Sequence, residues 1–100
     1  MMFACLSDPS SAVGFRLAGV ETAEAADRQA AADAFRRFAG RQDIGVIIVT
    51  GKVSRLIGEE IALHRRERDL PVVLEVPSAG EFSGGVSIEE FVRQALGVSI

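Results

Sequence analysis

The chain has 100 residues, enough for one domain with a single hydrophobic core. Hydrophobic residues make up 48% and charged residues 25%, the balance of a folded globular protein. The formal net charge of −3 argues against a nucleic-acid-binding groove. The basic run Arg65-Arg66-Glu67-Arg68 closes a predicted helix, where cations favour the negative end of the helix dipole.

The single cysteine, Cys5, excludes an internal disulfide framework and favours a reducing, intracellular compartment. It lies in an apolar run without a histidine pattern to activate it, so we interpret it as a small buried hydrophobe. The start Met1-Met2-Phe3-Ala4 lacks the basic region and the long apolar region of a signal peptide. No apolar run reaches the ~20 residues of a membrane span. The sequence predicts a cytosolic protein, compatible with attachment to a membrane-bound partner.

The first predicted element is a strand over Met2–Leu6. Asp8 is expected to cap the following helix, with Pro9 at the first helical position, where a missing N–H costs nothing. This helix is predicted to run to about Ala18, with Gly19 in its C-terminal turn.

A brief second strand is expected at Val20–Glu21. Thr22 is then expected to cap the next helix, with Glu24 in its first turn. An alanine-rich face would let this helix lie close to its neighbour, and Gly40 is predicted to end it. The apolar positions at helical spacing are Ala26, Ala30, Ala31, Ala34, Phe35 and Phe38.

The run Ile44–Val49 is apolar on both alternating faces, which indicates the central strand of a parallel sheet covered on both sides. Apolar residues at helical spacing, beginning with Val53, predict one helix that ends near Arg66. Gly58 lies inside this helix, where it costs about 1 kcal/mol relative to alanine, so we expect it to serve close packing.

The last predicted strand is Val72–Val76, preceded by Pro71 and stopped by Pro77. The segment from Ser78 to Gly85 is polar and glycine-rich, which places a flexible loop at about residues 79–86. A final helix follows: Ser87 and Glu90 form a capping box, and Val86 and Phe91 form a hydrophobic staple.

The alternation βαβαβαβα predicts an α/β domain over residues 1–100. We expect a four-stranded parallel sheet with right-handed crossovers and helices on both faces. A flavodoxin-like or Rossmann-like arrangement with strand order 2-1-3-4 fits this pattern.

Ligands of such sheets bind beyond the carboxyl ends of the strands, where Ser7, Asp8, Thr50, Lys52 and the residues 75–78 are expected. A phospho-acceptor receiver would need a second acid beside Asp8 and an aspartate where Thr50 stands. A divalent cation would find too little negative charge. The segment from Gly80 to Gly85 lacks the Lys-Ser/Thr ending of a phosphate loop.

Two further polar residues have simple interpretations. His64 has no second ligand or nucleophile in view, so we expect a half-exposed surface residue. Glu75 interrupts an apolar strand, and an unpaired carboxylate in the core would cost several kcal/mol. It is therefore expected either to face solvent on an edge strand or to contact a basic patch of a partner.

Several blocks of the sequence together resemble the F subunit of archaeal and bacterial V/A-type ATP synthases. They follow that family's order over nearly the whole chain, although Glu21-Thr22-Ala23-Glu24 stands where relatives often have a longer, more apolar strand. The blocks are Ser7-Asp8-Pro9, Gly14-Phe15-Arg16-Leu17-Ala18-Gly19-Val20, Asp43 to Thr50, Leu70 to Ser78 and Ser87 to Val98.

The resemblance implies a central-stalk rotor subunit without an ATP-hydrolysing site, cofactor or metal of its own. In that family the F subunit binds the coiled-coil D subunit and turns with it inside the catalytic A/B hexamer, above the membrane rotor. Rotation couples proton or sodium movement to ATP synthesis or hydrolysis in other subunits. The C-terminal helix of relatives can change position.

Candidate contact residues follow from this hypothesis. The segment Gly14 to Gly19 holds a ring, a guanidinium and a leucine between two glycines, which suits close packing or a protein contact. The alternative to contact by Phe15 and Leu17 is that both face the sheet. The candidates are Phe15, Arg16, Leu17, Glu75, Arg93 and Gln94.

Two other functions remain open from the residues alone. A stand-alone receiver-like or nucleotide-sensing domain would use Asp8, Thr50 and Lys52. A minimal enzyme would need a nucleophile paired with its base, which the sequence does not offer in a recognisable arrangement.

Overall fold

The computed structural model describes residues 1–81, in which strands alternate with helices as the alternating apolar and amphipathic runs predict. The elements are β1 (Met2–Ser7), α1 (Ala12–Leu17), β2 (Glu21–Glu24), α2 (Arg28–Ala39), β3 (Ile44–Thr50), α3 (Gly51–Leu56), α4 (Gly58–Glu67), β4 (Val72–Val76) and a 3-10 turn η1 (Ala79–Glu81).

The four strands form one parallel sheet in the order β2-β1-β3-β4, which confirms the predicted topology. β1 and β3 lie in the middle, where their nearly continuous apolar sequences are buried on both faces. β2 and β4 lie at the edges, and both carry glutamates that an edge strand can present to water.

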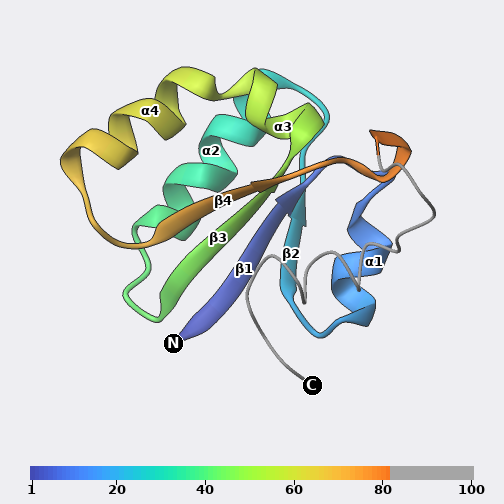
Figure 1. Cartoon of the computed structure of the whole chain (residues 1–100), viewed down its shortest axis with the longest axis horizontal. Coiled ribbons are helices and arrows are strands. Elements are labelled where there is room, and N and C mark those ends of the chain that lie inside the picture. Colours follow the sequence, from blue (N-terminus) through green and yellow to red (C-terminus); the bar gives the residue numbers. More distant parts are fainter. Residues whose placement is uncertain (82–100) are drawn as a thin grey trace.

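Helices cover both faces of the sheet, as Figure 1 shows: α2, α3 and α4 lie on one side and α1 on the other. The larger core cluster packs α2, α3 and α4 against the sheet, with Phe35, Ile47 and Ile61 among its members. The smaller cluster surrounds Phe15 of α1 and includes Cys5, Ile48 and Val76. The expectation that Cys5 is a small buried hydrophobe is thus confirmed.

The first helix begins later than predicted, and Asp8 does not cap it. Residues 9–11 form a turn, α1 starts at Ala12, and Ser11 occupies the N-cap position. The Asp8 side chain accepts hydrogen bonds from hydroxyl groups, not from helix amides. Gly19 does close the helix, with a φ of +82° that side-chain-bearing residues rarely adopt.

The second helix also begins later than predicted. Thr22 and Glu24 belong to β2, which is longer than predicted because it pairs with β1 from Ala4 to Ser7. Asp27 is the true N-cap of α2, since its carboxylate accepts the Ala30 N–H at 2.9 Å.

The apolar face of α2 is shifted accordingly. Ala26 and Ala30 are exposed, whereas Ala31, Ala34, Phe35 and Phe38 are buried as predicted. Gly40 follows the helix as its C-cap, also as predicted.

The single helix predicted from Val53 to Arg66 is two helices. The backbone leaves helical geometry at Ile57, with φ −123° and ψ 33°, and the Ile57 side chain is fully buried in the larger cluster. Gly58 begins α4, and a Cβ added there would meet no atom within 4 Å. The prediction that Gly58 serves close packing is therefore wrong.

His64 is buried, which corrects the expectation of a half-exposed surface residue. Its Nε2 lies 2.7 Å from the carbonyl oxygen of Pro71, and its ring meets Phe35 edge-on at a centroid distance of 5.5 Å. The imidazole joins α4 to the chain that enters β4 and to α2.

The last strand has the predicted bounds, Val72–Val76. Of the predicted loop at residues 79–86, the first three residues form η1, and the others lie outside the described residues. The predicted C-terminal helix with Ser87 and Glu90 also lies outside them. Within residues 1–81 no helix combines the length and apolar character needed to cross a bilayer.

Candidate functional site

A buried carboxylate lies at the carboxyl edge of the sheet. Asp8 follows β1 directly and is only 4% exposed. Its Oδ1 accepts the hydroxyls of Thr50 and Ser78 at 2.7 Å each, and its Oδ2 accepts that of Ser10 at 2.7 Å. The Ser11 hydroxyl lies 3.0 Å from both oxygens. Parallel strands bring these groups together, because Asp8, Thr50 and Ser78 each stand at or just beyond the carboxyl end of a strand.

Three of these hydroxyls also accept a backbone N–H. Thr50 Oγ1 accepts the N–H of Asp8 at 3.0 Å, Ser78 Oγ that of Lys52 at 2.9 Å, and Ser11 Oγ that of Ala79 at 2.8 Å. Each of these hydroxyls must therefore point its own hydrogen at the carboxylate. We call this arrangement the hydroxyl relay: Asp8, Ser11, Thr50 and Ser78. It links the β1–α1 turn, the start of α3 and the chain after β4.

Hydrogen bonds from the relay and from Ser10 keep Asp8 ionised. Burial by itself raises the pKa of this carboxyl group, but hydrogen bonds from Ser10, Ser78, Thr50 and Ser11 favour the charged form. The hydrogen bonds prevail, and the pKa of Asp8 lies well below its usual range. The negative charge is thus satisfied by hydroxyl dipoles rather than by a cationic side chain.

The turn after β4 is held by a second set of contacts. The Glu81 carboxylate accepts the Ser78 N–H at 2.9 Å and pairs with Arg55 of α3 at 2.7 Å. These bonds lower the pKa of Glu81, the Ser78 backbone bond most of all. A Cβ on Gly51 would lie 2.5 Å from Glu81 Oε1, so the absence of a side chain there lets the turn sit on α3.

The geometry gives little support to a receiver-like site. An open hollow of about 410 Å³ lies beside Asp8, Ser10 and Lys52. Both carboxylate oxygens already accept hydroxyl hydrogens, and Thr50 is fully buried beneath them. The Lys52 side chain is exposed and forms no ion pair with Asp8. Phosphorylation of Asp8 would have to break the relay first.

No group suited to nucleophilic or metal chemistry stands out in residues 1–81. Burial, and next the nearby charge of Asp8, raise the pKa of the Cys5 thiol far above its usual value. Among these residues no group of three His, Cys, Asp or Glu side chains is arranged to hold a metal ion.

The predicted contact residues on α1 divide between core and surface. Phe15 is fully buried in the smaller cluster, which was the alternative to a contact role. Leu17 is 82% exposed, and Val13, one helical turn earlier, is 61% exposed. Arg16 pairs with Glu24 of β2. Helix α1 therefore presents an apolar pair beside an exposed ion pair, and sequence reasoning missed Val13.

Glu75 points to solvent from the edge strand β4 and pairs with Arg65 of α4 at 3.1 Å. Its predicted position on an edge strand is confirmed, and its contact with a partner stays a prediction. The same guanidinium donates to the carbonyl oxygen of Val73 at 3.0 Å. The other two predicted contact residues, Arg93 and Gln94, lie outside the described residues.

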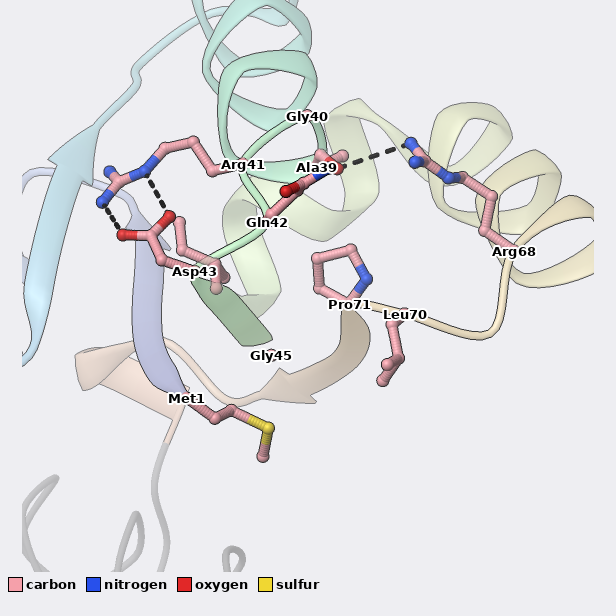
Figure 2. Close-up of a pocket in the computed structure, with 11 residues that line it drawn as sticks. Met1, Ala39, Gly40, Arg41, Gln42, Asp43, Gly45, Arg68, Leu70 and Pro71 are labelled. Atoms are coloured by element: carbon pink, nitrogen blue, oxygen red, sulfur yellow. Dashed lines mark hydrogen bonds and ion pairs between the residues drawn. The ribbon is translucent and has the colours of Figure 1, made fainter.

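A groove of about 300 Å³ opens at the opposite, amino-terminal edge of the sheet. Figure 2 shows Met1 and Leu70 on either side of Gly45, with Pro71 next to Leu70. Arg68 reaches across the rim to the carbonyl oxygen of Ala39 at 3.4 Å. This edge is the one at which parallel α/β sheets do not place their ligands.

Comparison with known proteins agrees with the resemblance seen in the sequence. Residues 3–94 match the model of the family described as ATP synthase (F/14-kDa) subunit. The F subunit of the A-type ATP synthase of Pyrococcus furiosus is 30% identical, over 100% of this chain and 98% of that protein. The corresponding protein of Thermococcus kodakarensis is 32% identical over the same shares.

A eukaryotic relative matches a shorter segment. The F subunit of the V-type proton ATPase of Rattus norvegicus is 32% identical over 66 residues, which are 66% of this chain and 53% of the rat protein. Since the family model covers nearly the whole chain and archaeal relatives match it end to end, this chain belongs to the F-subunit family of A/V-type ATP synthases.

Proposed function

We propose that this chain is a non-catalytic central-stalk subunit of an A/V-type rotary ATP synthase. In this role it binds the D subunit and helps couple ion translocation to ATP synthesis or hydrolysis. The observation that carries the proposal is the match to the F-subunit family over residues 3–94, together with end-to-end similarity to archaeal A-type proteins.

The arrangement of polar groups supports a role in binding rather than in chemistry. The carboxylate at the carboxyl edge is engaged in structural hydrogen bonds, and the thiol is buried with a raised pKa. Catalysis would then belong to the A and B subunits. The chain itself would lie in the cytoplasm and be held at the membrane through the complex, without contacting nucleic acid or entering the bilayer.

Helix α1 offers a docking face for the D subunit. Leu17 and Val13 are exposed on the same side of the helix, where they can pack against an apolar stripe of a long helical partner. Arg16, which already pairs with Glu24, can exchange part of that pairing for an acid of the partner. Glu75, Arg93 and Gln94 remain further candidates for the same complex.

Binding of purified D subunit by isothermal titration calorimetry tests the proposal. Burying one leucine side chain contributes roughly 1.5–3 kcal/mol, so Leu17→Glu is expected to weaken binding by about tenfold or more. Leu63→Glu is the matched control, because Leu63 is 45% exposed on α4, on the opposite face of the sheet. Failure of the unmodified chain to bind the D subunit would refute the proposal. If Leu17→Glu and Leu63→Glu weaken the affinity for the D subunit equally, α1 is not the docking face.

A further inference from the structure

Polar contacts position the turn after β4. Residues 79–81 contribute no buried side chain, so apolar packing does not hold them in place. The turn is instead attached through the Ala79 N–H to Ser11, through the Ser78 hydroxyl to Asp8, and through Glu81 to Arg55. Two of these three attachments pass through the hydroxyl relay.

The start of α1 depends on the same relay. Ser11 is the N-cap residue, yet its side chain makes no capping hydrogen bond and is directed at the Asp8 carboxylate. Helix α1 has six residues, of which only Ala12 and Phe15 are buried. A helix this short has little stability of its own, so its direction depends on the anchor at its first turn and on Phe15.

We propose that Asp8 is a positioning residue for partner docking, acting through Ser11. This inference rests on the proposed binding of the D subunit. The carboxylate orients the Ser11 hydroxyl, which holds the beginning of α1 and the Ala79 amide in one arrangement. The exposed side chains of Val13 and Leu17 are thereby presented before the partner arrives, and less conformational entropy is lost on binding.

Ser11→Ala tests the inference, with Ser10→Ala as the matched control. Both variants remove one hydroxyl that donates to Asp8, but only Ser11 also accepts a backbone N–H. Because Ser11 makes no side-chain capping bond, its loss acts on the relay rather than on the helix cap. Ser11→Thr restores a hydroxyl at the same position and serves as the rescue variant.

The first measurement is made on the free chain by amide hydrogen exchange. We expect faster exchange at Ala79 and along α1 in Ser11→Ala, and little change there in Ser10→Ala and Ser11→Thr. Unchanged exchange in Ser11→Ala would overturn the inference whether or not the D subunit binds, because the relay would then hold neither segment.

The second measurement is the affinity for purified D subunit, at a temperature where circular dichroism shows every variant fully folded. A role in stability alone would leave this affinity unchanged. We expect Ser11→Ala to weaken binding about tenfold, Ser10→Ala to have little effect, and Ser11→Thr to recover most of the loss. Equal affinities of Ser11→Ala and the unmodified chain would overturn the inference alone. Absence of binding by the unmodified chain would refute the proposed function and the inference with it.

Discussion

The substitution Thr50→Val removes one hydroxyl from the centre of the relay while keeping the shape of the side chain. Thr50 is fully buried, donates to Asp8 Oδ1 at 2.7 Å and accepts the Asp8 N–H at 3.0 Å. The lost hydrogen bond to a charged acceptor is worth about 1.5–3 kcal/mol, and an N–H left buried without a partner costs about 1–3 kcal/mol. Since these contributions overlap, we expect the free energy of unfolding to fall by about 3 kcal/mol.

The measurement is urea unfolding followed by far-ultraviolet circular dichroism, because the chain has no tryptophan or tyrosine for fluorescence. A loss of about 3 kcal/mol corresponds to a fall in Tm of roughly 12–24 °C for a domain of this size. Ser10→Ala is the reference, because Ser10 is exposed and water can replace its hydroxyl; we expect it to cost about 1 kcal/mol or less. A Thr50→Val loss no larger than that of Ser10→Ala would refute the account of the relay.

Two further predictions concern stability. Because the pKa of Asp8 is lowered by folding, its carboxylate stabilises the fold fully above the unfolded-chain pKa of about 3.9, and this contribution is lost as the pH falls from there toward the folded-state pKa. The stability gap between the unmodified chain and Asp8→Asn, from urea unfolding, should therefore shrink below about pH 4; a constant gap from neutral to acidic pH would contradict this. Gly58→Ala should stabilise by about 0.5–1 kcal/mol, since the site is open and begins a helix, whereas Gly19→Ala should destabilise by about 1 kcal/mol, since φ is +82°. Thermal unfolding of both variants tests these two expectations, and Tm shifts of the same sign would contradict them.

Local sequence patterns predict an element correctly where the interactions that determine its structure are themselves local. The alternation of apolar runs predicts the parallel sheet and its strand order, because a two-sided apolar strand such as Ile44–Thr50 can only lie in the middle. The glycine at position 19 predicts a helix end, because few other residues adopt its backbone conformation.

Predictions fail where a distant partner decides the outcome. Thr22 suits a helix cap by its local sequence, but pairing with β1 draws it into a strand. His64 stands isolated in the sequence, and the Pro71 carbonyl that it contacts is brought close by the turn before β4. The helix breaks at Ile57, whose side chain is buried in the larger core cluster, and the local sequence around it carries no signal for that burial.

The sequence predicts which polar residues lie at the candidate site, but not the hydrogen bonds that join them. Asp8, Thr50 and Ser78 are all polar residues expected at the carboxyl ends of strands, and therefore at one edge of the sheet. The role of Ser11 is missed, because Ser11 lies in the first turn of the predicted helix, and nothing at that position indicates a contact with a distant residue. Val13 lies four residues before Leu17 and therefore on the same helix face, but only the packing of α1 against the sheet shows that this face is exposed.

Fold class, strand order and family can be predicted from the amino-acid sequence alone, because the apolar periodicity and the family-like blocks are local features of the sequence. The role of Asp8 does not follow from the sequence, because a carboxylate next to serines can serve as a helix cap, as a phosphate acceptor or as a hydrogen-bond acceptor for neighbouring hydroxyls. It became the centre of a buried relay because strand pairing and chain crossovers brought hydroxyls from positions 50 and 78 to within 2.7 Å of it.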